Sequence, residues 1–209
     1  WIPATSVTVT WTAVDVGGIS HFEVGWDGGP LQNVSLETSA STDNLAPGAH
    51  SVTVKAYDRA GNTVQRNVTF SVDVSRPSVA LTPPDGAILG QEIVTIDAHV
   101  VDEGSGTHNT TIRIDGRTVR MYSNAEWFSF STALTEGMHV INVTSADGAG
   151  NRAYASNVVI VDSTPPELNI TAPDEGSALH QGDIYVSWEF SDNVSVVSVE
   201  RSFDGGPWV

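Results

Sequence analysis

The stretch HSVTVKAYDRAGN at residues 50–62 returns as HVINVTSADGAGN at residues 139–151, which is 89 positions further along the chain. In both copies polar residues alternate with small or apolar ones and lead into an Asp-x-x-Gly-Asn sequence. Alternation with a period of two predicts a strand with one buried face. The aspartate and glycine that follow predict a tight turn, in which the glycine takes a left-handed conformation. The stretch therefore predicts the same β-hairpin twice.

The repeat extends over the whole chain of 209 residues. Trp11 and the run DGGP at residues 27–30 reappear 177 positions later as Trp188 and the run DGGP at residues 204–207. A repeating unit of about 88 residues has the size of an independent β-sandwich rather than of one solenoid turn. Each copy is therefore expected to have its own hydrophobic core.

Alternating patterns occur throughout the chain, and no window shows the 3.6-residue period of a helix, so only strands are predicted. The second copy is expected to form six strands, at residues 79–82, 93–101, 110–114, 127–134, 139–146 and 153–161. Asp-Gly turns are expected to link a strand to its hairpin partner at residues 27–29, 115–116 and 204–206. The expected domains are residues 1–74, lacking the first strand, residues 77–163, which are complete, and residues 166–209, holding the first three strands of a third copy.

Two segments, VTVTWTAVD at residues 7–15 and VDSTPPELNITAPDEGS at residues 161–177, together with the two hairpin stretches, resemble a known group of proteins. They are similar to the tandem immunoglobulin-like and fibronectin-III-like repeats of archaeal and bacterial cell-surface proteins of the surface-layer, filament or adhesin type. The resemblance implies an all-β fold of tandem Ig-like β-sandwich domains, one complete and two partial. It also implies a buried tryptophan at Trp11 and Trp188. The second copy has Ala98 in that place, and Trp127 is expected to fill the volume.

Composition limits the classes of partner. Nine Lys and Arg against 25 Asp and Glu give a net charge of −16, which argues against nucleic acid or an anionic membrane and favours cations. The chain has no cysteine, which excludes disulfides, thiolate nucleophiles and cysteine zinc sites. No run approaches the roughly 20 apolar residues of a transmembrane helix. No direct membrane insertion is therefore expected of these residues.

Asn-x-Ser/Thr sequons are more frequent than random placement predicts, which would be about two. Six are present, at Asn33, Asn67, Asn109, Asn142, Asn169 and Asn193. Asn142 and Asn169 alternate with core-facing residues, so their side chains are expected to point to solvent. Two interpretations stay open. The sequons either carry N-glycans, which would place the protein outside the cytoplasm, or reflect the strand preference of Val and Thr.

Carboxylates are expected to gather where one repeat joins the next, because two loops of such a sandwich lie at the end where the chain enters. The candidates are Asp73, Asp102, Glu103 and Asp147 at the first junction, and Asp162 and Asp192 at the second. Calcium takes six to eight oxygen ligands, which such a cluster and turn carbonyls would supply. No contiguous D-x-D-x-D-G loop is present, so the alternative stays open that these aspartates only cap turns and that no cofactor is required.

No catalytic motif is found: the chain has no H-E-x-x-H, no G-x-S-x-G and no phosphate-binding glycine loop. His50 and His139 are repeat equivalents, for which a structural role is expected. The sequence thus predicts a non-enzymatic extracellular structural protein, an array of Ig-like domains in a prokaryotic surface layer, sheath or filament. Its expected partners are other copies of itself, surface-layer components and covalent N-glycans. The alternative is an adhesin stalk or the carbohydrate-binding accessory modules of a secreted enzyme.

Overall fold

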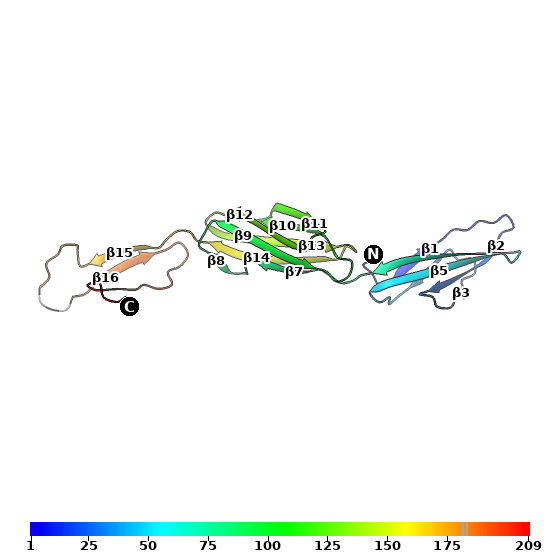
Figure 1. The fold of residues 1–209 in the computed structure, drawn as a ribbon, viewed down its shortest axis with the longest axis horizontal. Helices are drawn as coiled ribbons and strands as arrows, with labels where there is room; N and C mark the ends of the chain where they lie inside the picture. Colours follow the sequence, from blue (N-terminus) through cyan, green and yellow to red (C-terminus); the bar gives the residue numbers. More distant parts are fainter. Residues whose placement is uncertain (181, 183) are drawn as a thin grey trace.

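The computed structural model describes residues 1–209 apart from 181 and 183, and the described residues form strands and no helix. This confirms the all-β prediction. The strands gather into three units that follow one another along an elongated molecule (Figure 1). We call the strands within residues 7–72 the first unit, those within 78–161 the second unit and those within 167–191 the third unit. No helix among the described residues could cross a membrane.

The second unit consists of two sheets. The five-stranded sheet has the order β11 (Arg117–Ser123), β10 (Thr107–Ile114), β13 (Gly137–Asp147), β14 (Arg152–Val161) and β8 (Ala87–Leu89). The three-stranded sheet has the order β12 (Trp127–Ala133), β9 (Ile93–Val101) and β7 (Ser78–Thr82). Neighbouring strands are antiparallel except β8, which runs parallel to β14. All six predicted strands are present, with ends that differ by at most three residues.

Two strands of the second unit had no predicted range. β8 is three residues long, which is too short for alternation to be visible in the sequence. β11 is the hairpin partner that the Asp115-Gly116 turn predicts. Both turn residues have positive φ, 51° and 79° respectively, as a two-residue hairpin turn of this type requires.

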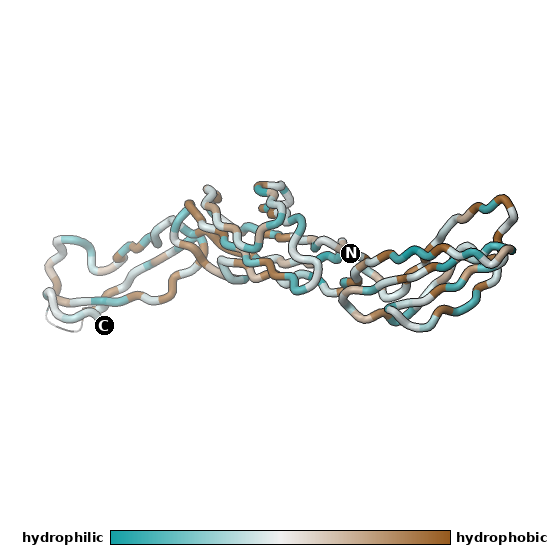
Figure 2. Tube along the Cα trace, turned by 45° about the vertical axis from the view of Figure 1, so that its right-hand side comes forward, coloured by the Kyte–Doolittle hydropathy of each residue, from teal (hydrophilic) through white to brown (hydrophobic). Residues whose placement is uncertain are grey.

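The core of the second unit lies between its two sheets. On β9 the side chains of Val94, Ile96, Ala98 and Val100 are at most 3% exposed, and they pack in one cluster with Ile141 and other residues of the facing sheet. Figure 2 shows the corresponding alternation of hydrophobic and hydrophilic residues along the strands. Burial of this apolar surface is the main force that holds the two sheets together.

Trp127 does not fill the core volume next to Ala98, so that prediction is wrong. Trp127 is 70% exposed and stacks on the ring of His99, with ring centroids 3.7 Å apart. Its neighbour Phe128 is 4% exposed and lies opposite Ala98 in the β12–β9 register. Successive strand residues point to opposite faces, and the register selects Phe128 for the core.

The first unit has the same two-sheet plan. One sheet pairs β1 (Val7–Thr10) with β4 (Ser39–Thr42), and the other has the order β3 (Gln32–Asn33), β2 (Ile19–Trp26), β5 (Gly48–Asp58) and β6 (Thr63–Val72). Ile2 forms a parallel bridge with Val72. Val161 is the equivalent of Val72 in the second unit, 89 positions later, and it pairs in parallel with Leu89 of β8. The start of the chain therefore occupies the place of β8.

The third unit has one strand fewer than predicted among the described residues. β15 (Glu167–Ala172) pairs with β16 (Ser187–Ser191), and the described residues after β16 form no further strand. The equivalent third strand of the second unit is β10, which pairs with β13. Residues 166–209 contain no segment equivalent to β13. A strand without its hydrogen-bonding partner leaves backbone groups unsatisfied, which explains the missing third strand.

Candidate functional site at the junction of the first two units

The junction is built around Asp73, which follows the last residue of β6 and is 1% exposed. Its Oδ1 accepts hydrogen bonds from the backbone N–H and the hydroxyl of Ser75. Its Oδ2 accepts a hydrogen bond of 2.7 Å from the backbone N–H of Ser105 in the second unit. The backbone carbonyl of Asp73 also accepts a 2.9 Å hydrogen bond from Nδ2 of Asn151. A linker carboxylate is therefore held by loops of the following unit.

Two further aspartates come from loops of the second unit. Asp102 follows β9, and its Oδ2 accepts hydrogen bonds from the backbone N–H groups of Gly104 and Gly106 at 3.2 and 2.8 Å. Asp147 ends β13 and is 2% exposed. It accepts hydrogen bonds of 2.8 Å from both the backbone N–H and the Nδ2 of Asn151. These contacts are those of the turn that the Asp-x-x-Gly-Asn sequence predicts.

The three carboxylates converge. Asp73, Asp102 and Asp147 each have an oxygen that lies within 4.8 Å of an oxygen of both others. Burial raises the pKa of Asp102, and the nearby carboxylates of Asp73 and Asp147 raise it further. Burial also acts to raise the pKa of Asp73, but the hydrogen bonds from Ser75 and Ser105 outweigh it, so this pKa is lowered. The site is a concentrated negative charge.

The other predicted ligands lie outside this cluster. Glu103 is exposed and belongs to no cluster of three ligands among the described residues. Asp162 is the repeat equivalent of Asp73, and its Oδ1 is buried without a hydrogen-bond partner. Asp192 accepts hydrogen bonds of 2.8 Å from the backbone N–H groups of Val194 and Ser195. The first junction thus brings three of its four predicted acids together.

Gly104 and Ser105 take part in the junction, although neither is among the predicted ligands. A Cβ atom placed on Gly104 would overlap the carboxyl group of Asp73. Ser105 also accepts a 2.9 Å hydrogen bond through Oγ from the backbone N–H of Ala149. The Gly104-Ser105-Gly106 run was a signal for such a close approach, because glycine in a loop often permits another chain segment to pass near it.

Replacing Gly104 by alanine is expected to expel Asp73 from the junction, since the added methyl group and the carboxyl group cannot share one volume. Small-angle X-ray scattering of the 209-residue chain should then show a broader distribution of interatomic distances. Gly90→Ala is the matched control, because the nearest atom to its Cβ is the carbonyl oxygen of Asp162 at 4.0 Å. Identical scattering from Gly104→Ala and the unsubstituted chain would contradict the expectation.

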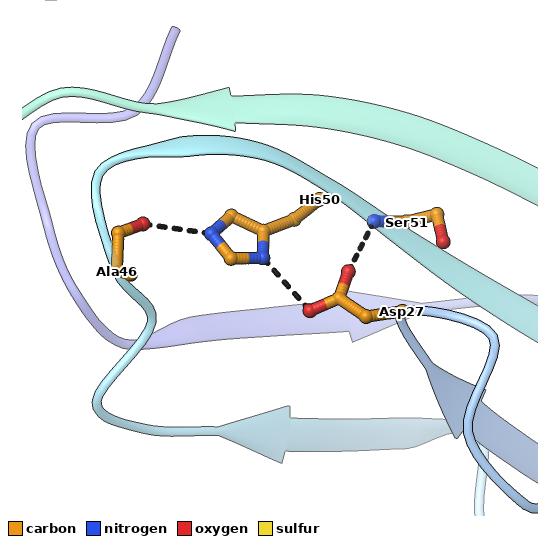
Figure 3. A network of polar contacts seen from close by, with 4 residues as sticks. All are labelled: Asp27, Ala46, His50 and Ser51. Carbon is orange, nitrogen blue, oxygen red and sulfur yellow. Dashed lines mark hydrogen bonds and ion pairs between the residues drawn. The ribbon is translucent and has the colours of Figure 1, made fainter.

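A second polar feature occurs in both the first and the second unit. In the first unit His50 Nδ1 lies 2.8 Å from Oδ2 of Asp27, and His50 Nε2 lies 2.7 Å from the carbonyl oxygen of Ala46 (Figure 3). Asp27 Oδ1 accepts a 2.7 Å hydrogen bond from the backbone N–H of Ser51. We call this arrangement the aspartate–histidine clasp. It joins the Asp-Gly turn to the start of β5.

The clasp recurs in the second unit. His139 Nδ1 lies 2.7 Å from Oδ2 of Asp115, and its Nε2 lies 2.8 Å from the carbonyl oxygen of Thr135. Asp115 Oδ1 accepts a 2.9 Å hydrogen bond from the backbone N–H of Val140. A carboxylate and a carbonyl are both acceptors, so both ring nitrogens must donate, which only the imidazolium form can do. The expected structural role of these histidines is therefore that of a charged hydrogen-bond donor.

Five of the six sequon asparagines are exposed: Asn33, Asn67, Asn109, Asn169 and Asn193. Asn142 is half-buried on β13, and its Oδ1 accepts a hydrogen bond from the hydroxyl of Tyr154. Asn142 lies on the face of β13 that points away from the core, as the alternation predicts. The prediction for Asn169 is not met in the same way, because its neighbours Leu168 and Ile170 on β15 are 61% and 63% exposed and face no core. Attachment of glycans at these positions stays a prediction.

Comparison with known proteins identifies the fold. No protein-family model matches the chain. The fibronectin(III)-like modules of Clostridium thermocellum CbhA match 77% of this chain and 87% of theirs with a TM-score of 0.51 and 20% sequence identity. The likeness shows that the chain has the β-sandwich fold of these fibronectin-III-like modules over most of its length.

Two curated proteins are similar in sequence. Hyalin of Strongylocentrotus purpuratus is 26% identical over 206 residues, 93% of this chain and 16% of hyalin. Chitinase Chi52 of Paenibacillus xylanexedens is 24% identical over 205 residues, 98% of this chain and 37% of the chitinase. The chain therefore spans well under half the length of either relative.

Proposed function

We propose that these repeats are non-enzymatic structural modules of an extracellular protein, and that an array of them forms part of a prokaryotic surface layer, sheath or filament. The observation that carries the proposal is the junction. Asp73 of the linker is buried and hydrogen-bonded to Ser105 and Asn151 of the next unit. Such a junction resists bending between the two units. The fixed φ of Pro77 in the Arg76-Pro77 segment of the same linker limits the bending further.

Other features support this proposal. In the first two units the apolar side chains at alternate strand positions mostly face the cores. The outer strand faces are rich in Ser and Thr, as expected of modules that stay soluble side by side. The sequons lie on outer faces or in loops, where N-glycans would fit. In such an array other copies of the chain and further surface-layer components are the partners.

Immunogold labelling of intact source cells with antibodies against the chain tests the proposal. We expect continuous label over the cell surface, together with a mass of the native protein that falls on deglycosylation. For residues 1–209 the unmodified mass is 22.1 kDa, so peptides bearing the six sequons would account for the excess. Label confined to the cell interior would overturn the proposal.

A second candidate is a set of accessory modules in a secreted carbohydrate-active enzyme, or an adhesin stalk. The similarity to chitinase Chi52 favours it. The exposed Trp127 ring, stacked on His99, is also the kind of surface on which sugar rings stack. Retention of the chain on insoluble chitin, lost in Trp127→Ala, would support this candidate, whereas a structural array predicts no retention.

A further inference from the structure

We infer that the carboxylates of Asp73, Asp102 and Asp147 form a calcium site that joins the first unit to the second. This inference deepens the proposed function, because a cation bound here would link the linker to two loops of the following unit. It is carried by the geometry of the junction and by an unsatisfied oxygen. Nothing in it depends on where in the cell the protein resides.

The charge of the cluster is uncompensated. Asp73 and Asp147 are 1% and 2% exposed, and their oxygens lie within 4.8 Å of one another and of Asp102. The ion pairs among the described residues are the two clasps, which lie elsewhere. Like charges at this distance in a buried setting repel strongly. A bound cation would remove that repulsion, and the net charge of −16 favours its approach.

One carboxylate oxygen of the cluster is left without a partner. Asp102 Oδ2 accepts hydrogen bonds from the backbone N–H groups of Gly104 and Gly106. Asp102 Oδ1 exposes less than 1 Å² to solvent and accepts no hydrogen bond. An acceptor buried in this way is destabilising unless something binds it. The neighbouring side-chain groups are themselves carboxylates, which accept and do not donate, so a bound cation would satisfy this oxygen.

The donor atoms select the kind of cation. All three ligands are carboxylate oxygens, with no imidazole or thiolate in the cluster, and oxygen ligands favour calcium or magnesium over zinc. Two oxygens that each lie about 2.4 Å from one calcium ion are at most about 4.8 Å apart. The separations in the cluster fall within that limit. Calcium also accepts irregular coordination by turn carbonyls, which magnesium does not.

Parts of the site recur in the other copies of the repeat. In the first unit Asp15 accepts a hydrogen bond from the backbone N–H of Gly17, and Asp58 accepts two from Asn62. These contacts reproduce those of Asp102 and Asp147. At the second junction Asp162 takes the place of Asp73, and Asp162 Oδ1 is buried without a hydrogen-bond partner, whereas Asp73 Oδ1 accepts hydrogen bonds from Ser75. The linker aspartate is therefore the third ligand, and it completes a pair of aspartates that the first and the second unit both have.

Calcium titration of the 209-residue chain by isothermal calorimetry tests the inference. We expect one or more sites with a Kd no weaker than about 10⁻³ M, the range of extracellular calcium modules. Asp102→Asn keeps the shape of the side chain and removes one charge, so binding at this site should weaken at least tenfold. In the absence of calcium the same variant should melt no lower than the unsubstituted chain, because it relieves repulsion in the cluster.

Glu103→Gln is the matched control, since Glu103 is adjacent in sequence, exposed and outside the cluster. It should retain the calcium affinity. Three results would each overturn the inference: no calcium binding at millimolar concentration, equal loss of binding in Glu103→Gln and Asp102→Asn, or equal affinity for magnesium. None of them bears on cell-surface labelling, so failure of the calcium site can be told apart from failure of the structural-array proposal.

Discussion

Replacing Ile141 by alanine is expected to lower the free energy of unfolding of the second unit by about 3 to 4 kcal/mol and to leave the first unit unchanged. Ile141 is 0% exposed and lies on β13, between β10 and β14. The substitution removes three buried carbon atoms and leaves a cavity that the surrounding β-branched residues cannot fill without moving. Urea unfolding followed by tryptophan fluorescence and circular dichroism would measure the effect.

The first unit provides the reciprocal variant. Val52 is 1% exposed and occupies the same place in the repeat as Ile141. Val52→Ala should shift only the transition of the first unit, and Met138→Ala, at a position 70% exposed on β13, should shift the second by less than about 0.5 kcal/mol. A common shift of both transitions in either core variant would contradict the proposed division into domains at residues 1–74 and 77–163.

Most strands of the second unit could be predicted because two independent signals agree at them. Alternation fixes which residues face the core, and an aspartate or glycine with the required backbone conformation fixes where the strand ends. On β13 both signals are present, since Ile141 and Val143 are 0% exposed and Gly150 has a φ of 100°. The parallel strand β8 has neither signal over its three residues.

The error at Trp127 has a physical cause that sequence alone does not remove. Trp127 and Phe128 are adjacent aromatic residues, and either could face the core in a strand of period two. A shift of one residue in the register exchanges the two faces. The pairing of Phe128 with Ala98 decides which of the two rings faces the core. This pairing depends on how β12 aligns with β9 and on the loop between β11 and β12, and the sequence contains no pattern that sets this alignment.

The topology of the repeat was sufficient to predict which aspartates meet at the candidate site. The repeat places one loop after β9 and one turn after β13 at the end where the linker enters, so Asp73, Asp102 and Asp147 could be expected together. Glu103 could not be separated from Asp102 without the loop conformation, which directs one carboxylate inward and leaves the other exposed. The contribution of Ser105 also depends on the conformation of that loop, because the backbone N–H of Ser105 donates a hydrogen bond to Asp73.

Asp115→Asn is expected to destabilise the second unit in a pH-dependent way, because it removes the negative charge of the clasp. Burial acts to lower the pKa of His139, but hydrogen bonds to Asp115 and to the carbonyl of Thr135 outweigh it and raise this pKa above its ordinary value. Burial acts to raise the pKa of Asp115, whereas hydrogen bonds from Val140 and His139 lower it overall. The ionised pair is therefore more favourable in the folded chain than in the unfolded chain.

The signs of these shifts define the pH window of the clasp. A histidine whose folded pKa is raised contributes fully below about pH 6.5, its unfolded value, and the contribution disappears as the pH rises through the folded pKa. An aspartate whose folded pKa is lowered contributes above about pH 4, and the contribution disappears as the pH falls through the folded pKa. Between about pH 4 and pH 6.5 both contributions are present.

At pH 6 we expect Asp115→Asn to cost about 1 kcal/mol, a value reduced for solvent screening because the Asp115 side chain is 48% exposed. Melting of the second unit should fall by about 5 °C, and the difference should become smaller as the pH rises through the folded pKa of His139, because the part that depends on the imidazolium charge is then lost. Asp27→Asn removes the equivalent charge beside His50 and should reproduce this pH profile in the first unit only. An equal loss at pH 6 and pH 9 would show that the clasp acts through a neutral hydrogen bond, and the imidazolium assignment would then be wrong.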